Sequence, residues 1–172
     1  EGSRLALLTT SEQIAQAATI IGEADRIRYL TSQLHLEMVS ELRWPGDQPS
    51  STGIDVGSLE LSPTELATLD ILRRPDVMAW VARWNGGRVL ADTTRALMAT
   101  SSALAVVSVE GQSLTDYARG GSAVEAVWIT AQSRGLSVHP ISPAFLYAAS
   151  RDEFDKLSPA FAIDLCRLQV AF

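Results

Sequence analysis

The sequence predicts an α+β fold, in which a small and mostly antiparallel sheet is covered by helices. Most segments repeat apolar residues at three- and four-residue spacing, which is the period of an amphipathic helix. Short apolar runs at 4–9 and 102–109 predict strands, and the second run is continuous enough for the middle of a sheet. No strand–glycine–helix unit carries a GxGxxG motif, so a doubly wound dinucleotide-binding sheet is not expected.

The N-terminal part after the first strand is predicted to be helical. Thr10 and Gln13 have the spacing of a capping box and begin a helix that Gly22 is expected to end. A second helix is predicted over residues 23–42. Its apolar residues share one face, and Arg26 is expected among the polar residues away from that face.

The middle of the chain contains a predicted loop followed by strong helix signals. Residues 45–61 are rich in Gly, Pro, Ser and Asp, which indicates an ordered loop or lid. Residues 62–65, Ser-Pro-Thr-Glu, combine a cap, a proline at the first helical position and a glutamate at the third. Further helices are expected from Pro75, over 89–100, and in short segments after Pro143.

Residues 120–143 are predicted to form a helix, a glycine stop and a short strand, and they carry the main functional signal in the chain. Its first part carries one apolar stripe, formed by Ala123, Val124, Val127, Trp128 and Ala131. Gly135 then supplies the glycine stop that a helix end prefers. Residues 136–141 are predicted to form a short strand, which Pro140 and Pro143 end because neither has a backbone N–H.

The run 135–143, GLSVHPISP, resembles the Gly-Leu…Pro-Ile-Glu-Gly corner of FMN-dependent nitroreductases. The glycine-rich, alanine-rich helix before it is similar to the central dimer helix of that family. The likeness is greatest to a divergent actinobacterial branch with nitroreductase-like domains. Some of these domains are fused behind an adenylating domain of the ubiquitin-activating type.

This resemblance implies an FMN-dependent oxidoreductase that uses NAD(P)H to reduce a small acceptor and forms a homodimer. It further implies that His139, Pro140, Ile141 and Ser142 lie against the flavin ring near its N5 and O4 atoms. No residue is assigned a catalytic role, because the cofactor carries out the hydride transfer. Apart from the resemblance, the same residues are compatible with a simple proline-rich strand end.

The chain also departs from the family pattern. Pro143 stands where the family has a glycine, and proline cannot offer a backbone N–H to the flavin. The family's arginine-rich phosphate motif has no counterpart in residues 1–10, and its basic group near the C-terminus is absent before Phe172. The alternative is therefore a non-catalytic dimerisation or regulatory domain of a larger, adenylating-type enzyme that has lost flavin binding.

Both interpretations treat residues 1–172 as one nitroreductase-like domain, expected to be a fragment that lacks those two parts of the family pattern. This expectation rests on a chain that begins at Glu1 without a methionine and stops at Phe172 directly after an apolar stretch. The net charge of −6 provides no attraction to nucleic acid or to an anionic membrane. No apolar run approaches the roughly 20 residues of a membrane span. Since Cys166 is the single cysteine, the chain suits a reducing, cytoplasmic environment.

The remaining polar and aromatic residues are expected to be structural. His35, with Glu37 and Glu41, is assigned to a solvated helix face, and no zinc motif is present. The pair Arg73-Arg74 is interpreted as cations at a helix C-terminus. Cys166 is expected to be a core thiol. The four tryptophans are predicted to lie in the core or at a dimer interface.

Overall fold

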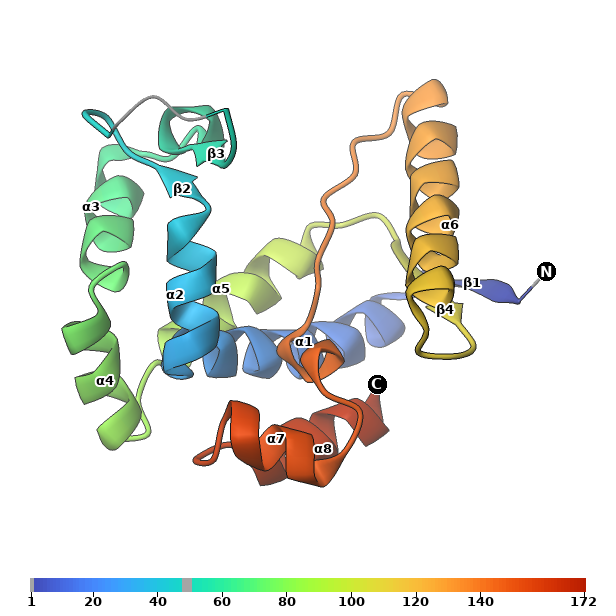
Figure 1. Cartoon of the computed structure of the whole chain (residues 1–172). Helices are drawn as coiled ribbons and strands as arrows, with labels where there is room; N and C mark the ends of the chain where they lie inside the picture. The colour runs from blue at the N-terminus through green and yellow to red at the C-terminus, as the bar shows by residue number, and fades with distance from the viewer. Residues whose placement is uncertain (1, 48–50) are drawn as a thin grey trace. The chain divides into compact units, whose positions relative to one another are not determined.

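A computed structural model describes residues 2–47 and 51–172, and it shows an α+β fold as predicted (Figure 1). The α-helices are α1 Ser11–Leu30, α2 Ser32–Ser40, α3 Pro63–Leu72, α4 Pro75–Arg83, α5 Arg88–Ala99, α6 Leu114–Ser133, α7 Arg151–Leu157 and α8 Ala162–Ala171. The strands are β1 Ser3–Leu8, β2 Leu42–Arg43, β3 Ile54–Asp55 and β4 Leu104–Val109, and two 3-10 helices are η1 Val56–Leu59 and η2 Ala144–Tyr147. Three residues of the expected loop, 48–50, lie outside the described part.

The chain divides into two compact units. Unit 1 comprises the described residues within 1–18 and 96–142, and unit 2 those within 19–95 and 143–172. Unit 1 holds the β1–β4 sheet and α6, whereas unit 2 holds the other complete helices and the short parallel pair of β2 and β3. Among the described helices, none is long and apolar enough to cross a membrane.

The sheet of unit 1 joins the two segments that the sequence marked as strands. β1 and β4 are antiparallel, with Ser3 opposite Val109 and Leu8 opposite Leu104. Helix α6 packs against β4, since a Cβ on Gly120 would meet Val109 at ordinary contact distance, 3.5 Å. Within the described residues β4 pairs with β1 alone, so the expected central position in a sheet is not seen.

Helix α6 ends where predicted, at the glycine stop. Its cap is Ser113, whose hydroxyl accepts from the Asp116 amide while the Asp116 carboxylate accepts from the Ser113 amide. This capping box begins the helix before the glycine pair Gly120-Gly121. At the other end Gly135 has φ +76°, and the amides of Gly135 and Leu136 donate to the carbonyls of Gln132 and Ala131. That is a Schellman stop.

The strand predicted over 136–141 is wrong. Residues 136–143 adopt no regular secondary structure. The physical reason is the pair of prolines, because Pro140 and Pro143 remove two of the donors that a strand ladder needs. In addition, the described structure pairs no strand with this segment.

The prediction that Gly22 ends the first helix is also wrong. Helix α1 continues through it to Leu30, because Gly22 lies against α5. A Cβ at position 22 would sit only 2.7 Å from the carbonyl oxygen of Ala91. The break comes instead at Thr31, which is extended and whose hydroxyl hydrogen-bonds that of Ser158 at 2.7 Å. The single helix expected over 23–42 is therefore split between α1 and α2.

Several local signals are confirmed. Thr10 and Gln13 form the predicted capping box of α1. Ser62 caps α3 together with Glu65, and Pro75 begins α4. The core of unit 2 collects around the second half of α1, where Ala24 and Ile27 have no exposed surface. It is completed by α7, α8 and η2 through buried residues that include Phe145, Phe154 and Leu165.

We expect Gly22→Ala to destabilise the protein, although alanine normally favours a helix over glycine by about 1 kcal/mol. The added methyl meets backbone that cannot move aside, so the net loss should be about 1–3 kcal/mol. Urea unfolding followed by circular dichroism measures it. The matched control is Gly120→Ala, where the nearest atoms lie at 3.5 Å and 3.6 Å and no loss is expected. A Gly22→Ala protein as stable as the wild type would contradict the close contact.

Hydrogen bonds from Ser113 hold the pKa of Asp116 below its usual value; the Ser113 hydroxyl contributes most and its amide next. We expect Ser113→Ala to raise the Asp116 pKa toward the ordinary aspartate value, as measured by NMR titration of the carboxyl carbon. Because the folded-state pKa is depressed, this capping interaction is complete above the ordinary aspartate pKa. It is lost as the pH falls through the lowered pKa. An unchanged Asp116 pKa in Ser113→Ala would show that other groups set it.

Candidate functional site

The residues predicted to face a flavin lie together in one exposed stretch. His139, Pro140, Ile141 and Ser142 follow α6 and close the last segment of unit 1, and all four are exposed in this chain. The next residue, Pro143, is buried and caps η2 in unit 2. We name residues 136–142 the corner. The local reason for its position is the Schellman stop at Gly135, which ends α6 and turns the chain away from the helix axis.

The corner offers a few backbone donors and one apolar surface. The Leu136 amide donates to the Ala131 carbonyl at the end of α6, while the residues from His139 to Ile141 belong to no helix or strand and the N–H groups of His139 and Ile141 are the donors of this part. Pro140 and Pro143 have none. The surface is completed by the His139 imidazole, the Ser142 hydroxyl and the Ile141 side chain. Ile141 is 39% exposed. Such a surface fits the polar edge and one face of a flat aromatic ring.

Unit 1 has few cations that could bind the phosphate of a flavin nucleotide. Unit 1 contains three arginines. Arg4 is paired with Glu110 at 3.0 Å, and Arg119 with Asp116 at 3.1 Å. The third, Arg134, is the C-cap residue of α6 and comes two residues before the corner. The corner therefore supplies exposed backbone and the Ile141 side chain, and Arg134 is the cation closest to it in sequence.

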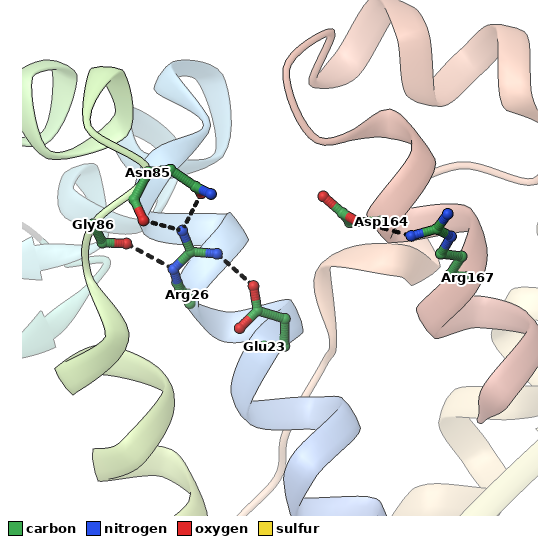
Figure 2. Close-up of polar contacts among 6 residues, drawn as sticks. All are labelled: Glu23, Arg26, Asn85, Gly86, Asp164 and Arg167. Atoms are coloured by element: carbon green, nitrogen blue, oxygen red, sulfur yellow. Dashed lines mark hydrogen bonds and ion pairs between the residues drawn. The ribbon is translucent and has the colours of Figure 1, made fainter.

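A buried guanidinium forms the densest polar cluster among the described contacts (Figure 2). Arg26 has only 6% of its surface exposed, although sequence analysis placed it among polar residues away from the core. It is ion-paired with Glu23, and it donates to the Gly86 carbonyl at 2.7 Å. It also donates to both the carbonyl and the side-chain oxygen of Asn85, at 3.1 Å and 2.6 Å.

This cluster explains the loop between α4 and α5. Asn85 has φ +49°, a left-handed conformation that asparagine tolerates better than most residues. Arg26 satisfies the carbonyls that this turn leaves without helical partners, and its guanidinium lies 5.7 Å from the ring centre of Phe161. These contacts occupy the Nε, Nη1 and Nη2 groups of Arg26 within the fold. We therefore assign Arg26 a structural role. No sequence signal distinguished it, because its partners come from residues 59 and 60 positions later in the chain.

The histidine expected on a solvated face is instead buried. His35 has 1% of its surface exposed, and its Nε2 lies 2.7 Å from the carbonyl oxygen of Leu72 at the end of α3. The expectation failed because α4 packs against α2 and the end of α3 reaches His35, whose imidazole pairs with a carbonyl that the helix end leaves open. Glu37 and Glu41 remain exposed. In the described residues no group of three His, Cys, Asp or Glu side chains is placed to hold a metal ion.

Unit 2 also contains a small apolar hollow of about 170 Å³. It is lined by Tyr29, Met38, Val39, Leu42, Leu59, Leu69, Leu72 and Arg73. Burial, and secondarily the charge of Asp25, raises the pKa of Tyr29. The volume is well below the roughly 300 Å³ at which ordinary ligand pockets begin. None of the corner residues lines it.

Other sequence expectations had mixed outcomes. Arg73 caps the end of α3 and pairs with Asp70, as a structural role predicts. Cys166 is half-buried against the core of unit 2. Trp80 and Trp84 are 53% and 76% exposed, so in this chain they are not core residues. Their ring centres lie 5.8 Å apart.

Comparison with known proteins gives one informative relative. No family model matches the chain, and no solved structure matches it. The chain is 58% identical over all of its 172 residues to "Uncharacterized protein MT1398" of Mycobacterium tuberculosis (strain CDC 1551 / Oshkosh). The aligned region is 24% of that relative, so the chain spans about a quarter of its length. This is compatible with a place inside a larger polypeptide.

We expect Arg26→Met to destabilise the protein by about 3 kcal/mol, because it leaves Glu23 and two loop carbonyls without their partner. Arg167→Met is the matched control (Figure 2): Arg167 has a 78% exposed side chain, and its contact with Asp164 is 3.9 Å long. Its loss should change stability by less than about 0.5 kcal/mol. Urea unfolding measures both variants. Equal effects of the two substitutions would refute a structural role for the buried arginine.

Proposed function

We propose that the chain is a nitroreductase-like, FMN-dependent oxidoreductase domain that acts as a homodimer in the cytoplasm. It would use NAD(P)H to reduce a small acceptor. The observation that carries this proposal is the corner: a glycine-stopped helix followed by an exposed, donor-poor His-Pro-Ile-Ser segment. It supports the proposal because exposed backbone and one apolar side chain are groups that can contact a flat ring.

The chemistry of such a domain belongs mainly to the cofactor, since a bound flavin accepts and donates the hydride. The residues of this chain would bind and orient it. The amide of Ile141 would donate to the polar edge of the ring, the Ile141 side chain would cover part of its face, and His139, Pro140 and Ser142 would lie beside it. Arg134 would supply positive charge for the phosphate. No side chain needs to move a proton for the flavin to bind.

The length of the relative supports a place for the domain inside a larger protein. We propose that the remaining part of that protein includes the adenylating domain suggested by the resemblance. A quarter of the relative's length is accounted for by this chain, which leaves ample room for such a domain. In that arrangement the oxidoreductase would act on a small molecule that the adenylating domain handles.

One observation favours a second function, a non-catalytic dimerisation or regulatory domain. Pro143 is buried at the start of η2 and has no N–H, where the family pattern has a glycine. A buried proline fixes the chain without offering a donor to a ligand. A domain that keeps the fold and loses the cofactor would tolerate this substitution.

We expect the intact protein to bind FMN, with quenching of flavin fluorescence on titration and a yellow protein after gel filtration. Ile141→Asp should weaken this binding at least tenfold, because it introduces a negative charge against the ring. Glu37→Gln, an exposed change on α2, should leave it unchanged. Consumption of NADPH or NADH by the FMN-loaded protein tests the activity itself.

The outcomes separate the two functions. An intact protein that ignores added FMN and oxidises neither nicotinamide favours the non-catalytic domain. Binding of FMN that Ile141→Asp does not affect would place the flavin elsewhere and remove the corner from the site.

A further inference from the structure

The apolar hollow of unit 2 lies between two helices that share a neighbour and pack little against each other. Helix α4 packs against both α2 and α3, whereas α2 and α3 make few direct contacts (Figure 1). Met38 and Val39 line the hollow from α2, and Leu69 and Leu72 line it from α3. Residues of α1, β2 and η1 contribute most of the remaining wall. The hollow is therefore space that α2 and α3 leave unfilled.

Helix α3 gives an independent sign that this space is underfilled. It has ten residues, and none of them is buried. Leu66 and Ile71 are exposed, while Leu69 and Leu72 are half-buried at the hollow. A short helix in a folded protein normally gains its stability by burying an apolar face. The face of α3 toward the hollow gains that burial when a molecule fills the hollow.

The wall of the hollow is apolar, and its one charged residue is already paired. Arg73 reaches the wall through carbon atoms of its side chain. Its guanidinium pairs with Asp70 at 2.8 Å and lies 4.2 Å from the ring centre of Trp44. A water molecule in a cavity needs about two to four polar partners, which an apolar wall does not provide. The hollow therefore favours an uncharged, apolar occupant over water or an anion.

The volume of the hollow sets the size of its occupant. About 170 Å³ is close to the roughly 150 Å³ of an apolar cavity that takes up benzene in another protein. The same volume is too small for the fused rings of a flavin or for a drug-sized ligand. A single six-membered ring, with one small substituent, matches both the size and the apolar character of the wall.

We propose that the hollow is a binding site for one uncharged, monocyclic aromatic molecule. Tyr29 and Met38 favour an aromatic ring among apolar ligands of this size, because aromatic pairs and contacts between a thioether and a ring are both attractive. A rigid ring also loses little conformational entropy on binding. The site does not rest on the proposed function, because it needs no FMN and no corner residue lines it. Its failure and the failure of the flavin assignment are therefore separate results.

The three methionines of the chain provide the first test. Toluene is titrated into protein labelled with ¹³C at the methionine methyl groups, in the absence of FMN. The Met38 signal should move and saturate, because the ring current of bound toluene acts on a residue of the wall. Met78 and Met98 are buried but do not line the hollow, so their signals should move much less. A Met38 signal that does not move, or three signals that move alike, would overturn the proposal.

A matched pair of variants on α3 provides the second test. Leu69→Trp places a larger side chain in the hollow, whereas Leu66→Trp makes the same change at an exposed residue outside it. Toluene should bind at least tenfold more weakly to Leu69→Trp than to Leu66→Trp, and circular dichroism confirms that both variants are folded.

Benzoate tests the preference for an uncharged ring on the wild-type protein, so this result does not depend on any variant. It has the same ring with a carboxylate, and it should bind at least tenfold more weakly than toluene because the wall offers no polar partner. Equal toluene affinities of the two tryptophan variants would refute the site. So would benzoate binding as tight as that of toluene.

Discussion

Burial of one side of α1 is the constraint on which unit 2 depends. Ala24 and Ile27 have no exposed surface, and Gly22 lets the carbonyl of Ala91 in α5 approach too closely for any side chain. One helical turn after Gly22, the guanidinium of Arg26 is buried in the same interior. It donates hydrogen bonds to the loop that joins α4 and α5. A charge can remain there because each of the described contacts of its guanidinium is with an oxygen or an aromatic ring. The helix thus fixes its neighbours by both close packing and hydrogen bonding.

Local signals were sufficient to predict much of the fold. Caps with matching third residues, as at Thr10 and Ser62, define helix starts through hydrogen bonds between residues three apart. Gly135 is equally local. The predictions that failed concern residues whose partners lie far away in the sequence. Gly22 indicates a helix break by propensity alone, but its role is set by α5, nearly seventy residues later. The buried positions of Arg26 and His35 depend on the loop after α4 and on the end of α3.

The candidate site illustrates the same division. The sequence located the corner because proline and glycine restrict the backbone wherever they occur, and the structure keeps those residues contiguous and exposed. The strand predicted for residues 136–141 was wrong, because a strand forms only where a neighbouring strand shares its hydrogen bonds. Ligand binding at the corner also depends on charged groups that lie outside residues 136–142. In unit 1 two of the three arginines already neutralise carboxylates, which limits the positive charge left for an anion.

The pairing of β1 with β4 has a consequence for how the chain acquires its structure. Ser3 lies opposite Val109, so more than a hundred residues must be in place before the first strand finds its neighbour. Closing so long a loop costs conformational entropy before any ladder bond offsets it, although the cost rises only slowly with length. Contacts of high sequence separation also slow folding. The contacts between α3 and α4 join residues close in sequence, so we expect them to form before the sheet. During synthesis β1 leaves the ribosome long before its partner strand exists.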